Sequence, residues 1–115
     1  MNFENYQYEA HKTSRFFSEP NQRENMLMAS LGLAGETGEI VDYIKKYVFH
    51  GHNIHVEKIK DELSDLLWYL AEMASCFNLD LEDIADHNIV KLQNRYGNLF
   101  TEEKSINRSL DRTEV

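Results

Sequence analysis

Two short acidic motifs contain the residues of this sequence that are best suited to chemistry. The motif "ETGE" at 36–39 supplies Glu36 and Glu39, and the motif "ELSD" at 62–65 supplies Glu62 and Asp65. Because each pair is three residues apart, both of its side chains lie on one face if the segment is helical. Four converging carboxylates repel each other and are costly to desolvate unless a cation offsets their charge. Mg²⁺ prefers oxygen ligands, so the pattern favours a magnesium site, with Mn²⁺ as an alternative ion.

The position of the two pairs along the chain decides between a metal site and ordinary surface charge. Either pair alone is more typical of a solvated helix face. However, Glu39 precedes Gly51 by 12 residues and Glu62 follows Gly51 by 11. If two helices pack antiparallel through the loop around Gly51, the pairs come level and all four carboxylates meet. A carboxylate-bridged di-iron bundle is a competing use of acids, but it needs Glu-x-x-His pairs, and no Glu here has His three residues later.

The elements that must position these acids are predicted to be helices. Apolar residues recur at helical spacing, and the sequence has one proline and five glycines. We predict four helices over about residues 3–17, 21–49, 56–78 and 81–96. The fold class is therefore all-α, as a four-helix bundle in one domain over residues 1–100, followed by a polar tail over residues 101–115.

The segment 21–49 is apolar on more than one side. Leu27, Leu31 and Val41 share one face, whereas Leu33 lies well away from it. A helix of this kind is buried on several faces, and four helices in so short a chain cannot easily surround one of their own. We therefore expect the bundle to be completed by oligomerisation, as a homodimer or homotetramer.

Three glycines, Gly32, Gly35 and Gly38, accompany the first acidic pair. Each costs about 1 kcal/mol relative to alanine inside a helix. Because they remove side chains beside the acidic face, we expect a ligand or another backbone to approach there.

Composition narrows the class of protein. The chain of 115 residues is 42% hydrophobic and 28% charged, which indicates a globular domain. Its net charge of −8 disfavours nucleic acid and membrane surfaces as partners. The single cysteine, Cys76, excludes a disulfide framework and is expected to be buried. The first residues do not resemble a signal peptide and no segment has transmembrane length, so we predict a cytoplasmic protein.

One further cluster offers a different metal. The loop "HGHNIH" contains His50, His52 and His55, which could bind zinc. No cysteine is close in sequence, so we treat zinc as the minor alternative.

At the acidic motifs the sequence resembles the MazG-like all-α nucleoside triphosphate pyrophosphohydrolases, whose hallmark is E-x-x-E, a gap, and E-x-x-D. Here "ETGE" and "ELSD" are separated by 22 residues. The segment "NIVKLQNRYG" matches an N-x-x-K-x-x-x-R pattern at Asn88, Lys91 and Arg95. The segments "YQYEAHKT" and "FTEEKSINR" are similar to one small single-domain branch. One departure is Gly97, where the family pattern has proline after the tyrosine.

The resemblance implies Mg²⁺-dependent cleavage of nucleoside triphosphates between the α and β phosphates, giving the monophosphate and pyrophosphate. The implied role is removal of non-standard nucleotides or control of nucleotide pools. The metal ligands would be Glu36, Glu39, Glu62 and Asp65. Either Glu36 or Glu39 would act as the general base.

The resemblance also implies substrate contacts outside the acidic motifs. Asn88, Lys91 and Arg95 would meet the phosphates, although basic residues beside an apolar helix face often only cover that face. Gln7 in the first helix would contact the base. Two alternatives stay open: a related enzyme acting on dUTP or phosphoribosyl-ATP, and a non-catalytic helical module that binds a nucleotide or a protein.

Overall fold

The computed structural model describes residues 1–108, and within these residues the chain is all-α, as predicted. Its helices are α1 (Phe3–His11), α2 (Gln22–Phe49), α3 (Val56–Cys76), α4 (Leu81–Tyr96) and α5 (Glu102–Ile106). The four predicted helices are present, and the described residues of the polar tail add the short α5. The chain divides into two compact units, one ending at Leu81 and the other beginning at Glu82, and each is described by itself.

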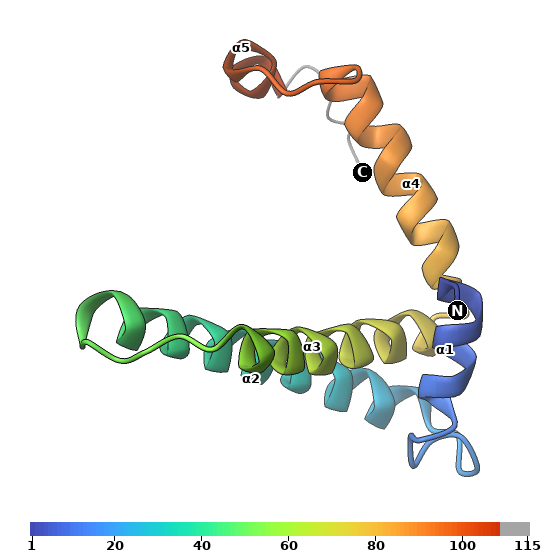
Figure 1. The fold of residues 1–115 in the computed structure, drawn as a ribbon. Helices are drawn as coiled ribbons and strands as arrows, with labels where there is room; N and C mark the ends of the chain where they lie inside the picture. Colours follow the sequence, from blue (N-terminus) through green and yellow to red (C-terminus); the bar gives the residue numbers. More distant parts are fainter. Residues whose placement is uncertain (109–115) are drawn as a thin grey trace. The chain divides into compact units, whose positions relative to one another are not determined.

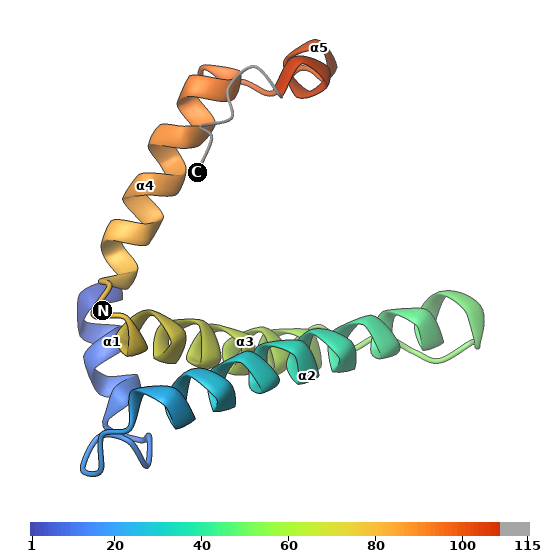
Figure 2. The same cartoon turned by 180° about the vertical axis from the view of Figure 1, so that it is seen from behind.

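Helices α2 and α3 form an antiparallel hairpin (Figures 1 and 2). The side chain of Asn21 caps α2 by accepting a hydrogen bond from the backbone N–H of Glu24. At the other end of α2, Gly51 adopts a positive φ of 73° in the loop that leads to α3. The hairpin is the antiparallel pairing that the spacing of the acidic motifs requires.

Helix α1 is shorter than predicted, because it ends at His11 and not near residue 17. The Ala10 carbonyl would accept the next α-helical hydrogen bond. It instead accepts from the backbone N–H of Thr13 at 3.0 Å, from the Thr13 hydroxyl at 2.6 Å and from the Trp68 indole at 3.2 Å. A hydroxyl close in sequence competes with the helical bonding pattern in this way. The predicted end near residue 17 is therefore wrong.

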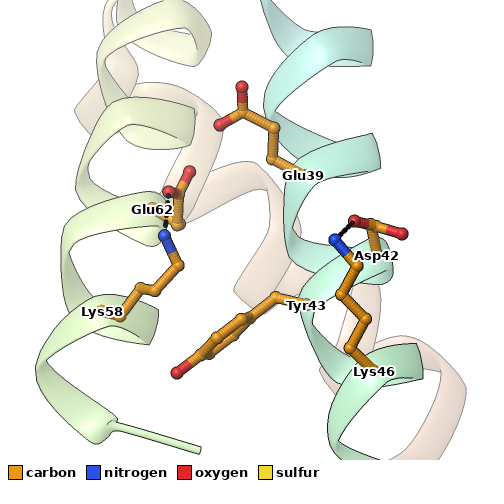
Figure 3. Close-up of a pocket in the computed structure, with 6 residues that line it drawn as sticks. All are labelled: Glu39, Asp42, Tyr43, Lys46, Lys58 and Glu62. Atoms are coloured by element: carbon orange, nitrogen blue, oxygen red, sulfur yellow. Dashed lines mark ion pairs between the residues drawn. The ribbon is translucent and has the colours of Figure 1, made fainter. Parts of the chain in front are cut away.

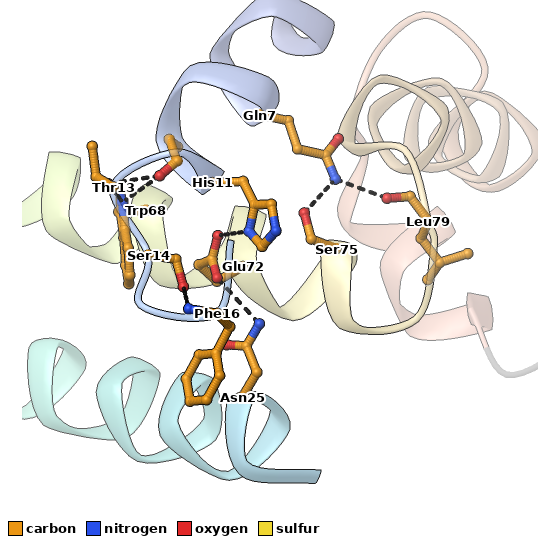
Figure 4. A network of polar contacts seen from close by, with 11 residues as sticks. Gln7, His11, Thr13, Ser14, Phe16, Asn25, Trp68, Glu72, Ser75 and Leu79 are labelled. Atoms are coloured by element: carbon orange, nitrogen blue, oxygen red, sulfur yellow. Dashed lines mark hydrogen bonds and ion pairs between the residues drawn. The ribbon is translucent and has the colours of Figure 1, made fainter. Parts of the chain in front are cut away.

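Helix α1 lies across the end of the hairpin that is remote from its loop (Figures 1 and 2). The amide of Gln7 holds it there (Figure 4): Nε2 donates to Ser75 Oγ at 3.1 Å and to the Leu79 carbonyl at 2.9 Å. Gln7 Oε1 accepts from the backbone N–H of Leu81 at 2.7 Å. One side chain thus joins α1 to the segment that follows α3.

The packing between α2 and α3 is close and uses small residues. Ala29 of α2 and Ala71 of α3 are buried. A Cβ at Gly32 would run into the ring of Tyr69, so glycine is required there for the two helices to approach. At Gly38 a Cβ would meet no atom within 4 Å. A side chain, and not a ligand or another backbone, therefore approaches Gly32, and at Gly35 and Gly38 the expected approach stays a prediction.

The opposite side of α2 is apolar and exposed. Leu27 and Leu31 are 60% and 65% exposed, and Val41 is 60% exposed. Cys76 is buried, as predicted. The hairpin therefore buries one apolar face and leaves another in contact with solvent.

The second unit contains α4 beyond Leu81 and α5. Lys104 Nζ donates to the Tyr96 carbonyl at 2.7 Å and so links α5 to α4. Arg95 Nε is buried and has no hydrogen-bond partner among the described residues. In the described part of the chain, no helix combines the length and apolarity needed to cross a membrane.

Candidate metal centre

Three carboxylates from the hairpin converge on one point. Glu36 of α2 and Glu62 and Asp65 of α3 each offer one oxygen, and these oxygens lie within 4.8 Å of one another. Glu36 and Glu62 are half-buried, whereas Asp65 is exposed. The convergence follows from the sequence, because acids three apart on α3 share a face and the hairpin brings that face level with Glu36. We call these three residues the acid triad.

The acid triad carries unbalanced negative charge. Glu36 Oε2 and Glu62 Oε2 are buried and have no hydrogen-bond partner among the described residues. Loss of solvent, a hydrogen bond to Glu62 and the charges of nearby carboxylates raise the pKa of Glu36 to about 7. Hydrogen bonds from Glu36 and Glu39 lower the pKa of Glu62. Without a cation, Glu36 therefore binds a proton more readily than an isolated glutamate does.

Glu39 lies beside the acid triad and is not one of its three members. Its pKa is raised, first by a hydrogen bond to Glu62 and then by the negative charge of Glu62. Its carboxylate is exposed and lines a neighbouring pocket. The four predicted ligands thus separate into three that converge and one that flanks them.

The acid triad fits a hard divalent cation. Its donors are all carboxylate oxygens, and two of its buried oxygens have no hydrogen-bond partner in the described part of the chain. Ligand oxygens about 2.1 Å from Mg²⁺ can be at most about 4.2 Å apart, so the observed spacing of up to 4.8 Å needs only a small side-chain rotation. Among residues 1–108, the three loop histidines form no comparable cluster.

A pocket of about 330 Å³ shares Glu62 with the acid triad, and Figure 3 shows the residues that line it. Its lining residues come from both helices of the hairpin: Glu39, Asp42, Tyr43, Lys46, Lys58 and Glu62. We call it the lysine pocket. Glu62 belongs to both the lysine pocket and the acid triad, and Glu39 lies beside the triad. The two sites are therefore adjacent.

Ion pairs arrange the charges of the lysine pocket. Lys58 Nζ lies 3.7 Å from Glu62 Oε1, and Lys46 Nζ lies 2.8 Å from Asp42 Oδ2. Hydrogen bonds from Lys46 and Lys45 lower the pKa of Asp42 to about 2. The pocket thus holds two ammonium groups close to carboxylates that remain ionised.

Sequence reasoning missed the lysine pocket, although its spacing was visible. Lys58 precedes Glu62 by four residues, and Tyr43 and Lys46 follow Glu39 by four and seven. These separations place each residue on the same helix face as the acid. Extending each acidic face by one or two turns towards the loop would have found all three.

The remaining predicted site residues lie elsewhere. Gln7 uses its amide for the three hydrogen bonds that hold α1, and its role as a base contact stays a prediction. Asn88, Lys91 and Arg95 belong to α4 in the second unit, and their contact with phosphate also stays a prediction.

Comparison with known proteins identifies a family whose matched region includes the acid triad. A family model described as "MazG nucleotide pyrophosphohydrolase domain" matches residues 23–100. The chain is also 32% identical over 76 residues to the Gene 37 protein of Mycobacterium phage L5. The aligned region covers 63% of this chain and 67% of the phage protein. No solved structure matches the chain. The family match includes both acidic motifs and the three predicted phosphate contacts of α4.

Proposed function

The chain belongs to the MazG nucleotide pyrophosphohydrolase domain family, and on that premise we propose that it hydrolyses (deoxy)nucleoside triphosphates with Mg²⁺. The products are the nucleoside monophosphate and pyrophosphate. The observation that carries the proposal is the acid triad, whose three carboxylate oxygens lie within 4.8 Å. The net charge of −8 opposes binding of a polyphosphate, and a cation held by the acid triad would offset that repulsion.

The acids of the hairpin have two roles in the proposed reaction, metal binding and proton transfer. Glu36, Glu62 and Asp65 would hold the cation, which supplies Lewis-acid polarisation of a phosphoryl oxygen and lowers the pKa of the attacking water. Glu39 flanks the acid triad with an exposed carboxylate, so we assign it the role of general base. The water oxygen bonds to the α-phosphorus and its proton passes to Glu39. The bond from the α-phosphorus to the bridging oxygen breaks, and pyrophosphate leaves with the electron pair.

The second unit supplies candidate phosphate contacts in this proposal. Lys91 is exposed on α4 and can reach an anion, and Asn88 lies one turn before it. Arg95 has a buried Nε that finds no partner among residues 1–108, which supports a role for its guanidinium in binding an oxyanion.

We further propose that the protein works as a homodimer or homotetramer. The exposed side of α2, with Leu27, Leu31 and Val41, supports this proposal. Large apolar side chains left exposed along one side of a helix are typical of protein interfaces. A second copy of the hairpin would bury this side of α2.

The proposal is tested by measuring pyrophosphate release from a panel of standard and modified nucleoside triphosphates that includes dUTP, together with phosphoribosyl-ATP. We expect Mg²⁺-dependent release from some members of the panel, and loss of release with excess chelator. The substrate that is turned over best decides between general house-cleaning and a dedicated dUTP or phosphoribosyl-ATP enzyme.

A matched pair of variants ties activity to the acid triad. Glu62→Gln removes a ligand charge, whereas Asp61→Asn makes the equivalent change at an exposed neighbour on α3 that is outside the acid triad. We expect the first to lose release by at least about 100-fold and the second to keep it. If the wild-type protein releases no pyrophosphate from any member of the panel, a non-catalytic nucleotide-binding module replaces this function.

A further inference from the structure

The lysine pocket points to a second part of the substrate site. We propose that it binds the pyrophosphate group, first as the β and γ phosphates of the substrate and then as the leaving group, with Lys58 and Lys46 as its contacts. This inference rests on the proposed function. It assigns the phosphate tail to the loop end of the hairpin, next to the acid triad (Figure 3).

Lys58 lies at the pocket, and the donors of its ammonium group remain available to a ligand. Its Nζ is 3.7 Å from Glu62 Oε1, which is longer than a hydrogen bond, and its side chain is 51% exposed. The ammonium also lies 5.3 Å from the ring centre of Tyr43. The Tyr43 hydroxyl is fixed in turn, because it accepts the backbone N–H of His55 at 2.8 Å. Tyr43 is therefore a positioning residue for an ammonium that keeps its donors available.

Lys46 can turn to a phosphate without leaving its present partner unpaired. Asp42 Oδ2 lies 2.8 Å from Lys46 Nζ, and Asp42 Oδ1 lies 2.9 Å from Lys45 Nζ. If Lys46 donates to a phosphate oxygen, Asp42 retains Lys45. Lys46 lines the pocket, whereas Lys45 does not.

The charge of the pocket explains why its occupant should arrive with a metal. Its lining has three carboxylates and two ammonium groups, which gives a formal charge of −1. Pyrophosphate alone would be repelled, whereas a divalent cation bound by the acid triad reduces the formal charge of pocket and triad together from −3 to −1 and offers its own positive charge to the phosphate oxygens. Negative charge then develops on the bridging oxygen as its bond to the α-phosphorus breaks. The two ammonium groups beside that oxygen would stabilise the transition state.

The test is isothermal titration of the full chain with Mg²⁺ alone, and then with inorganic pyrophosphate in the presence of Mg²⁺. Lys58→Ala and Lys46→Ala are compared with two controls that remove the same charge outside the pocket. The control for Lys58 is Lys60→Ala, an exposed lysine on the same helix. The control for Lys46 is Lys12→Ala, an exposed lysine outside the pocket that pairs with Glu9 as Lys46 pairs with Asp42.

We expect each pocket variant to bind pyrophosphate about tenfold more weakly, the size of a lost charge-assisted hydrogen bond. Lys58→Ala should bind Mg²⁺ alone at least as tightly as the wild type, because a cation that competes for Glu62 is gone. Lys58→Arg should recover pyrophosphate binding. A purely structural role for Lys58 would instead weaken Mg²⁺ and pyrophosphate binding together, and that result would overturn the inference.

Failure of this inference can be distinguished from failure of the proposed function. If the wild type releases pyrophosphate from nucleotides while the pocket variants bind Mg²⁺–pyrophosphate as well as their controls, this inference is wrong and the proposed function stands. If the wild type neither turns over any nucleotide nor binds Mg²⁺–pyrophosphate, both are wrong.

Discussion

The carboxylate of Glu72 is completely buried and lies 2.8 Å from Nδ1 of His11, which joins α1 to α3 through a polar contact (Figure 4). Asn25 of α2 donates to the other Glu72 oxygen at 3.2 Å. Three helices therefore meet at one buried acid. Its position, two turns along α3 from Asp65, makes this contact part of the framework behind the acid triad.

Replacing His11 should loosen α1. In His11→Ala the buried Glu72 carboxylate loses one of its two partners, and we expect the free energy of unfolding to fall by about 2–3 kcal/mol. Lys12→Ala is the matched control, because it removes an exposed pair with Glu9 and should cost less than about 0.5 kcal/mol. Denaturant unfolding of both variants checks this, and equal effects would contradict a structural role for the buried pair.

The glycines of α2 should respond differently to alanine. Gly32→Ala places a Cβ against the Tyr69 ring, so we expect a loss of about 1–3 kcal/mol of stability from overpacking. Gly38→Ala meets open space and should gain about 0.5–1 kcal/mol through helix propensity. Thermal unfolding measures both. A stabilised Gly32→Ala protein would show that α2 and α3 are farther apart than described.

The stability of the metal-free protein should fall as pH rises towards neutrality. The folded state raises the pKa of Glu36 from 4.5 to about 7, so its contribution is present below pH 4.5 and is lost as pH rises through about 7. The raised pKa of Glu39 acts in the same direction, and the lowered pKa of Glu62 acts in the opposite one.

Glu36→Gln isolates this effect, because glutamine stays neutral. In excess chelator we expect the variant to be more stable than the wild type at about pH 8, with the difference shrinking towards about pH 5. Thermal unfolding across this pH range is the measurement. A wild type that is the more stable of the two at the higher pH would mean that the acids of the hairpin do not repel each other.

The exposed side of α2 should mediate self-association. Leu31 is 65% exposed on this side of α2, and Leu31→Glu places a charge there. Association would bury this charge without a partner, which is costly. We expect the wild type to have the mass of a dimer or tetramer by light scattering after gel filtration, and the variant to have a lower mass. Monomeric wild-type protein at the concentration of the assay would contradict the expectation.

The acid triad was predictable because two local rules determine it. Helical spacing sets the face of each acid, and nearly equal distances from Gly51, 12 and 11 residues, set the level of the pairs once the helices are antiparallel. Which three of the four acids converge was not predictable. That depends on how far α2 and α3 approach, and the contact of Gly32 with Tyr69 is a tertiary feature.

Other features needed contacts that sequence spacing does not contain. The end of α1 at His11 depends on the Ala10 carbonyl, which accepts a hydrogen bond from Trp68, 58 residues away. The position of Glu72 within the apolar run "YLAEMAS" indicates that this acid is buried. The sequence does not indicate its hydrogen-bond partners on α1 and α2. The polar contacts of α1 are therefore the part of the fold that the sequence alone leaves open.

The central claim, that three carboxylates of the hairpin share one divalent cation, is tested most directly by a crystal structure grown with Mn²⁺. Anomalous scattering from manganese identifies the ion without ambiguity. We predict one strong peak bonded to oxygens of Glu36, Glu62 and Asp65 at about 2.2 Å. A manganese peak elsewhere, with these carboxylates turned separately to solvent, would contradict the account.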